Sequence, residues 1–158
     1  MSKVNIYYVS HCCLLIDIAG LRILTDPWII GPCWGGNLWL YPPAKIAPEE
    51  IKEIDYIYIS HAHEDHLHAE TLERISDNVK SNALTIAPDF GKPYFCKSLE
   101  ANGLKNILFL KHFQKTELKT NVLLTMFICD SLDDDSSILI ETEDGNIFLQ
   151  TDNLMSRD

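Results

Sequence analysis

The chain has 158 residues, a length that favours a single domain, 1–158, with a core that can form without disulfides. Thirteen Lys and Arg against 23 Asp and Glu give a formal net charge of −10, which disfavours binding to nucleic acid or to an anionic membrane surface. Hydrophobic residues at 46% and charged residues at 23% are ordinary globular values, so a disordered, collagen-like or coiled-coil chain does not fit.

From the sequence we expect neither a membrane span nor a signal peptide. Its longest near-apolar run, residues 12–18, is interrupted by Asp17, and the N-terminus leads directly into a strand-like pattern. The five cysteines are odd in number and include the adjacent pair Cys12 and Cys13, which has poor geometry for a disulfide. We therefore expect a reducing, cytoplasmic environment in which most of the thiols are buried.

The N-terminal part predicts three short antiparallel strands. Residues 4–9, 12–18 and 21–25 are rich in β-branched and large apolar residues, and Ala19-Gly20 marks a tight turn between the last two.

A long loop follows, from Asp26-Pro27 to about Pro48. It carries all three tryptophans of the chain together with several glycines and prolines. Aromatic loops of this kind either wall a binding pocket or cover a core, and the sequence leaves both alternatives open for Trp28, Trp34 and Trp39.

From Pro48 the pattern changes to alternating helix and strand. After a helical turn at 48–51, the sequence predicts elements in the order strand 54–60, helix 68–75, strand 83–87, helix 92–101 and strand 107–110. This βαβαβ order favours parallel neighbours. The remaining strands are predicted at 122–128, 138–141 and 147–150, with a hairpin turn at Asp144-Gly145 between the last two.

Four of the six histidines lie within eight residues, directly after the predicted strand 54–60. Side chains two positions apart on an extended backbone project to the same side, so His61 and His63 can bind one cation as neutral imidazoles. Asp65 and His66 add a carboxylate oxygen and a further nitrogen. Nitrogen and oxygen donors without thiolate suit zinc, iron or manganese, in a site that keeps a position open for water or substrate.

This His-x-His-x-Asp-His run resembles the signature loop of the metallo-β-lactamase superfamily. A narrower resemblance, over about residues 4–153, is to the metallo-β-lactamase-like domain of CMP-N-acetylneuraminate hydroxylase and to ascorbate-6-phosphate lactonase-like and N-acyl-phosphatidylethanolamine phospholipase D-like hydrolases. The segments that carry it are Thr25-Asp26-Pro27-Trp28-Ile29-Ile30-Gly31-Pro32, Trp39-Leu40, Pro42-Pro43 and Ile57-Tyr58-Ile59-Ser60-His61.

The resemblance implies an α/β fold, an αββα sandwich that binds one or two metal ions and uses a metal-bound hydroxide as nucleophile. This chain would hold its N-terminal half and the start of the second half, and would be short or truncated at the C-terminus. An exposed sheet face would then need cover, for which a second copy of the chain in a homo-oligomer is one source.

Matched by position, the resemblance assigns His61 and His63 to a first metal and Asp65 and His66 to a second. Asp152 matches the bridging aspartate, with a plain turn carboxylate as the alternative. Zinc is the expected metal, as one or two ions, and manganese and iron are the alternatives.

Two further residues match positions near the family's site. Asp26 matches a buried aspartate that orients the ligand loop. His11 matches a histidine that faces the active site, with a structural histidine as the alternative.

The chain departs from the family where the third histidine of the first metal is expected, just before the strand 138–141. No histidine lies between His112, which we expect at the surface, and the end of the chain. Asp130 or one of residues 133–135, Asp135 among them, would have to substitute, or the site is incomplete. The family also has a further metal-binding histidine beyond the point where this chain stops.

Three functions follow from these observations. The first is a metal-dependent hydrolase of a small-molecule ester, lactone, amide or phosphodiester, in which Asp65 or Asp152 orients water and accepts its proton. The second is a non-catalytic binding module of the same fold, related to sugar-nucleotide recognition. The third, hydroxylation by this chain alone, is not expected, because the Cys-x-His and Cys-x-x-His pairs of a Rieske centre are missing from the sequence.

Overall fold

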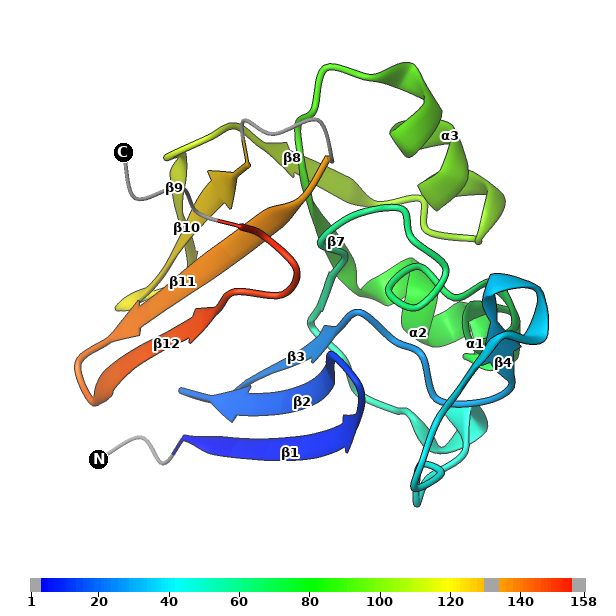
Figure 1. Cartoon of the computed structure of the whole chain (residues 1–158). Helices are drawn as coiled ribbons and strands as arrows, with labels where there is room; N and C mark the ends of the chain where they lie inside the picture. Colours follow the sequence, from blue (N-terminus) through cyan, green and yellow to red (C-terminus); the bar gives the residue numbers. More distant parts are fainter. Residues whose placement is uncertain (1–3, 130–133, 155–158) are drawn as a thin grey trace.

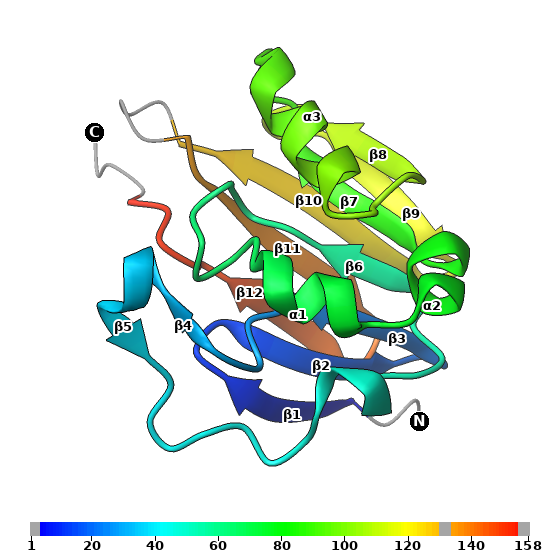
Figure 2. The same ribbon diagram turned by 90° about the vertical axis from the view of Figure 1, so that its right-hand side faces the viewer.

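The computed structural model describes residues 4–129 and 134–154, which form two sheets packed face to face with helices on the outer side of one sheet (Figures 1 and 2). The first sheet has the order β1 (Asn5–Ser10), β2 (Cys13–Ile18), β3 (Leu21–Thr25), β6 (Tyr56–Tyr58), β7 (Leu84–Pro88) and β8 (Ile107–Leu110). The second has the order β12 (Gly145–Leu149), β11 (Ser136–Thr142), β10 (Val122–Ile128) and β9 (Lys115–Lys119). The helices are α1 (Ala69–Arg74), α2 (Asp77–Asn82) and α3 (Pro93–Ala101).

Strand directions follow the predicted pattern. The strands β1, β2 and β3 form an antiparallel meander, and β3, β6, β7 and β8 are parallel. The hairpin between β11 and β12 turns at Glu143-Asp144, next to Gly145. The prediction of an antiparallel start followed by parallel α/β strands is therefore confirmed.

The sequence patterns missed two elements and overextended others. The short helix α2 lacks a clear apolar face, and β9 is rich in charge, so neither gives a strong hydrophobic signal. Strand β6 is shorter than predicted. The loop from Asp26 to Pro48 holds the two-residue strands β4 (Pro32–Cys33) and β5 (Leu38–Trp39) around the 3₁₀ turn η1 (Trp34–Gly36), and it ends at the 3₁₀ turn η2 (Pro48–Glu50).

The strand β6 and the residue after it show how period-two alternation builds two apolar cores. Ile57 and Ile59 pack under the helices with Leu72 and Phe95, whereas Tyr58 faces the other way, into the core between the two sheets. All of these side chains are fully or almost fully buried. The strand that leads into the histidine run is therefore held on both faces.

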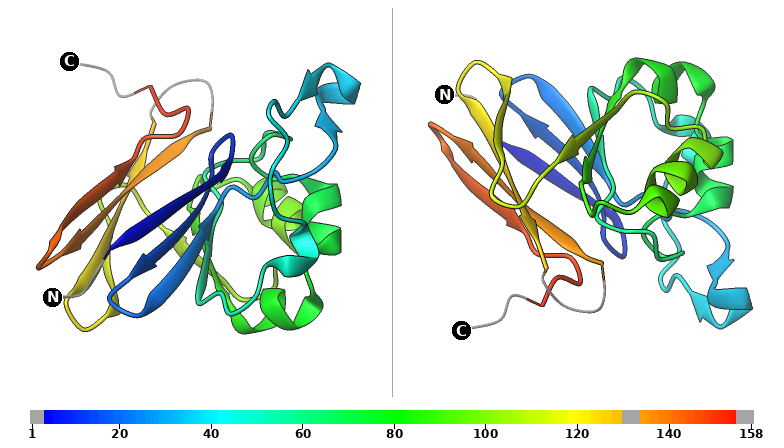
Figure 3. Two further views of the ribbon diagram at one scale, coloured as in Figure 1. Left: turned by 90° about the horizontal axis from the view of Figure 1, so that it is seen from below. Right: turned by 90° about the horizontal axis from the view of Figure 1, so that it is seen from above.

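Within the described residues, no helix covers the outer face of the second sheet (Figure 3). This face carries aromatic side chains. Phe127 contacts Phe113 and Phe148 edge to face, with ring centroids 5.6 and 5.9 Å apart. Phe113 is 67% exposed and Phe148 is 46% exposed. Across the described parts of the chain, no helix has the length and apolar character needed to cross a bilayer.

Candidate metal centre

One edge of the sandwich collects polar residues from both sheets. The turn between β1 and β2 carries His11, and the carboxyl ends of the parallel strands β3 and β6 lead into Asp26 and His61. In the second sheet, Asp135 precedes β11 and Asp152 follows β12, which pairs antiparallel with it. Residues far apart in sequence are thus brought together where ligands bind to α/β sheets.

His61 and His63 turn their rings toward each other. Nε2 of His61 lies 2.8 Å from Nδ1 of His63. The other ring nitrogen of His61, Nδ1, lies 2.9 Å from Oγ of Ser60 and 3.3 Å from Oδ1 of Asp135. These distances put Asp135, the expected substitute ligand, on the opposite side of the His61 ring from His63. Asp130, the other expected substitute, lies outside the described residues.

Asp65, His66 and Asp152 form the second part of the cluster. Nε2 of His66 lies 3.3 Å from Oδ2 of Asp152 and 3.7 Å from Oδ2 of Asp65. His66 is completely buried, yet this nitrogen makes no hydrogen bond of acceptable geometry within the described parts of the chain. Ligand atoms of His61, His66 and Asp152 lie within 4.8 Å of one another.

Asp26 contacts the histidine-containing loop through both of its carboxylate oxygens. Its Oδ1 accepts a hydrogen bond from the backbone N–H of Ser60 at 2.8 Å, and its Oδ2 accepts one from Ser60 Oγ at 2.7 Å. The same Oδ2 lies 2.9 Å from Nδ1 of His66. A carboxylate on Nδ1 keeps the proton there and leaves Nε2 to bind a ligand.

His11 lies in the turn of the first hairpin and contacts the cluster. Its Nε2 lies 3.1 Å from Oδ2 of Asp65, and its ring stands edge to face with those of Trp28 and His66. His11 and Asp26 have φ angles of 40° and 34°, a left-handed backbone that costs a non-glycine residue about 1–2 kcal/mol. Such conformations cluster at functional sites, where the surrounding structure holds them.

The sequence left open whether the three tryptophans wall a pocket or cover a core, and their positions in the structure differ. Trp28 is buried and donates its Nε1–H to backbone oxygens of Ile30 and Gly31, so it belongs to the core. Trp34 is 42% exposed, donates its Nε1–H to Oδ1 of Asp65 at 3.2 Å and stands edge to face with His63. Trp39 is exposed, and its Nε1–H donates to the backbone oxygen of Gly36 in the same loop.

The two remaining histidines lie apart from the cluster. His68, the fourth of the histidine run, accepts a hydrogen bond from the backbone N–H of Thr71 and caps α1. His112 is exposed, as predicted, and its Nδ1 accepts from the backbone N–H of Ile128.

Sequence reasoning did not assign three neighbours to the site, namely Ser60, Ser136 and Cys12, whereas for Trp34 it had left a pocket wall as one alternative. Ser136 Oγ donates to the backbone oxygen of Ser60 at 2.8 Å, and Tyr58 Oη lies 2.9 Å from Ser136 Oγ, which ties the two sheets together under the cluster. Ser60 could have been found from its place beside His61. Nothing in the sequence around Ser136 indicates its role.

Burial and the carboxylates shift the pKa values of these groups in different directions. Burial, assisted by the neighbouring His66, lowers the pKa of His61 to about 4, so its imidazole is neutral and able to act as a ligand. Burial opposes the charged form of His66, but the hydrogen bond and charge of Asp26 raise its pKa to about 9. Burial raises the pKa of Asp135 to about 6 and that of the Cys12 thiol to about 11.

The charge balance of the cluster suits a bound cation. Four carboxylates, those of Asp26, Asp65, Asp135 and Asp152, surround the histidines. In the described parts of the chain their ion pairs are all with histidine and none is with Lys or Arg. Because buried carboxylates need compensating charge, a divalent cation at the open Nε2 of His66 would match this donor set.

Comparison with known proteins identifies the family. The family model described as a beta-lactamase superfamily domain matches residues 5–149. The chain belongs to this family. Among curated proteins, the cytidine monophosphate-N-acetylneuraminic acid hydroxylase of Asterias rubens is 34% identical over 156 residues, which are 96% of this chain and 23% of that protein. The hydroxylase of Cricetulus griseus is 39% identical over 104 residues, 65% of this chain and 18% of that protein.

Solved structures share the metallo-β-lactamase fold. CmlA, a diiron beta-hydroxylase from Streptomyces venezuelae, is similar with a TM-score of 0.71 and 18% identity, over 97% of this chain and 30% of CmlA. Igni18, a metallo hydrolase from Ignicoccus hospitalis, is similar with a TM-score of 0.67 and 18% identity, over 98% of this chain and 63% of Igni18. The predicted metallo-β-lactamase-like fold is therefore confirmed, and the chain spans only part of these relatives.

Proposed function

We propose that the chain binds a transition metal at the edge of the two sheets and is a metal-dependent hydrolase of a small-molecule ester, lactone, amide or phosphodiester. The observation that carries the proposal is the buried Nε2 of His66, which has no hydrogen-bond partner in the described residues and faces carboxylate oxygens of Asp65 and Asp152. A buried polar atom left without a partner costs about 1–3 kcal/mol, which a ligand bond would remove.

Two metal positions are supported unequally. His66, Asp65 and Asp152 would hold one ion, and Nε2 of His61 with Nδ1 of His63 would hold another. The His61–His63 pair has no third ligand of its own among the described residues. Asp135 lies on the other nitrogen of His61, and Asp152, which has a ligand atom within 4.8 Å of one on His61, also lies beside His66. We therefore expect the ion at His66 to bind more tightly.

The chain's own residues would then perform distinct tasks. A bound transition metal supplies a Lewis acid that lowers the pKa of water and polarises the scissile group. Asp152, which is half exposed, would orient water and accept its proton on a carboxylate oxygen. Trp34 would fix Asp65 through its Nε1–H and present its exposed ring to substrate beside His63.

The first experiment measures metal and turnover together. Purified wild-type protein, exposed to zinc, iron or manganese and then dialysed, should retain one or two ions per chain and turn over members of an ester, lactone and phosphodiester panel. Where the wild type holds two ions, the His63→Ala variant should lose one of them and most activity, while the surface variant His112→Ala should keep the wild-type metal content and activity. Protein that stays metal-free would refute the proposal, and metal without any turnover would favour the non-catalytic binding module.

A second candidate is a part in CMP-N-acetylneuraminate hydroxylation, favoured by the 34% identity to the Asterias rubens hydroxylase over almost the whole chain. Such a reaction needs dioxygen as well as electrons, and a separate Rieske protein would deliver the electrons. Oxygen consumption that depends on added CMP-N-acetylneuraminate and an electron donor would select this candidate. Hydrolysis proceeds without either.

A further inference from the structure

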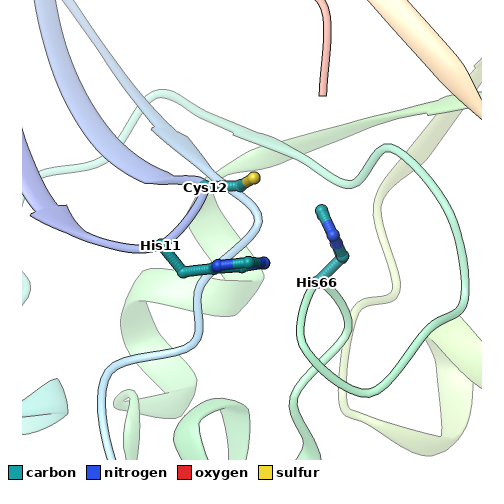
Figure 4. Close-up of side chains that lie close together, drawn as sticks. All are labelled: His11, Cys12 and His66. Atoms are coloured by element: carbon teal, nitrogen blue, oxygen red, sulfur yellow. The ribbon is translucent and has the colours of Figure 1, made fainter. Parts of the chain in front are cut away.

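Cys12 brings a sulfur atom to the metal centre that the histidine run does not include. Ligand atoms of His11, Cys12 and His66 lie within 4.8 Å of one another. In Figure 4 the sulfur of Cys12 and the rings of His11 and His66 face a common space. The adjacent cysteine behaves differently, because Cys13 is fully buried and packs in the core under the helices.

His66 gives this grouping a second, independent support. Its Nδ1 is occupied by Asp26, and its Nε2 is the buried atom without a hydrogen-bond partner in the described residues. A thiol is a weak hydrogen-bond donor and acceptor, so the Cys12 sulfur, within 4.8 Å of a ring nitrogen of His66, does little for the solvation of that ring. As a thiolate, however, sulfur is a strong ligand for a cation that the nitrogen also binds.

We propose that Cys12 is a ligand of the metal ion that His66 binds, so that this position takes nitrogen, oxygen and sulfur donors. The inference rests on the proposed metal centre and adds a sulfur ligand to it. On binding, the S–H proton leaves to solvent and the thiolate donates an electron pair to the cation, with no change of oxidation state. Thiolate with imidazole favours zinc over manganese, so we expect this position to prefer zinc to manganese.

Cobalt(II), which takes zinc positions and absorbs visible light, tests the proposal without an activity assay. The wild-type protein loaded with cobalt should show a sulfur-to-cobalt charge-transfer band in the near ultraviolet beside the visible bands of bound cobalt. Cys12→Ser should lose the charge-transfer band while elemental analysis still finds cobalt. The matched variant Cys96→Ser, on α3 beside Glu100, should keep the band.

Each other outcome overturns the proposal in a distinguishable way. Bound cobalt without the charge-transfer band in the wild type, or a band that survives in Cys12→Ser, removes Cys12 as a ligand and leaves the metal centre intact. Failure of the wild type to bind cobalt or zinc removes the metal centre as well.

Alkylation of the wild type keeps the proposal testable if Cys12→Ser does not fold. Zinc should protect Cys12, and not Cys96, from iodoacetamide, as read by mass spectrometry of the peptides. Equal modification of Cys12 with and without bound zinc would overturn the assignment.

Discussion

Replacing Asp26 by Asn tests the idea that a buried carboxylate orients the metal ligands. The two oxygens of Asp26 serve Ser60 N–H, Ser60 Oγ and His66 Nδ1 at 2.7–2.9 Å, and the side chain is fully buried. Asparagine tolerates the left-handed backbone but offers one acceptor, so at least one of these three contacts is lost.

The structure gives the size of the effect. A hydrogen bond to a charged group contributes about 1.5–3 kcal/mol, so metal-free Asp26→Asn should be destabilised by about that amount in urea unfolding. For a chain of this length this corresponds to a fall in Tm of about 2–4 °C per kcal/mol. Loss of the partner that orients His66 should also weaken metal binding by about 10–100-fold in a calorimetric titration.

The matched control is Asp17→Asn, which removes an Asp from a partly exposed ion pair with Arg22. Such pairs contribute about 0–1 kcal/mol, so stability should change little and metal affinity should not change. If Asp26→Asn binds metal as tightly as the wild type, Asp26 does not orient the ligand loop, whatever happens to stability.

Three further predictions concern Trp34, the protonation of His66 and the exposed aromatic face of the second sheet. Trp34→Phe keeps an aromatic ring but loses the bond to Asp65, so metal affinity should fall by the equivalent of about 0.5–1.5 kcal/mol in the same titration; an unchanged affinity would remove this role. In metal-free protein, the pKa of His66 is raised from 6.5 to about 9. Protonated His66 therefore stabilises the fold fully below pH 6.5, and this stabilisation is lost as the pH rises through 9. The free energy of unfolding in urea should fall over this pH range in the wild type, and it should depend less on pH in Asp26→Asn. If a second copy covers the aromatic face, light scattering should find a dimer that Phe148→Lys converts to monomer, and a wild-type monomer would contradict this.

The local part of the site could be predicted from the sequence because its geometry is local. His61, His63, Asp65 and His66 lie within six residues, and the strand before them fixes the direction in which the loop leaves the sheet. Spacing alone therefore brings these side chains close together. Their association with Asp26 and Asp152 came from family resemblance, since no local pattern links residues so far apart.

Other contacts could not be predicted because they depend on how the two sheets stack. Ser136 and Trp34 reach the cluster only through the packing of β11 and the path of the long loop. Most of the thiols were expected to be buried, and whether Cys12 or Cys13 faces the cluster depends on the exact turn after β1. The strand β9 was missed for a related reason, because its alternation is carried by charged residues at the edge of a sheet.

The candidate centre lies across the junction of the two sheets. Asp26, His61 and His66 follow strands of the first sheet, whereas Asp152 follows β12 of the second. Without a metal, the junction at this edge relies on bonds such as that from Ser136 Oγ to the Ser60 carbonyl, while Nε2 of His66 makes no hydrogen bond in the described residues and four carboxylates surround the histidines. A bound cation would satisfy that nitrogen, reduce the repulsion and join ligands from both sheets. Since such a site forms only when the sheets are packed, the binding energy adds directly to the stability of the fold, by about 2.7 kcal/mol at a metal concentration one hundred times Kd.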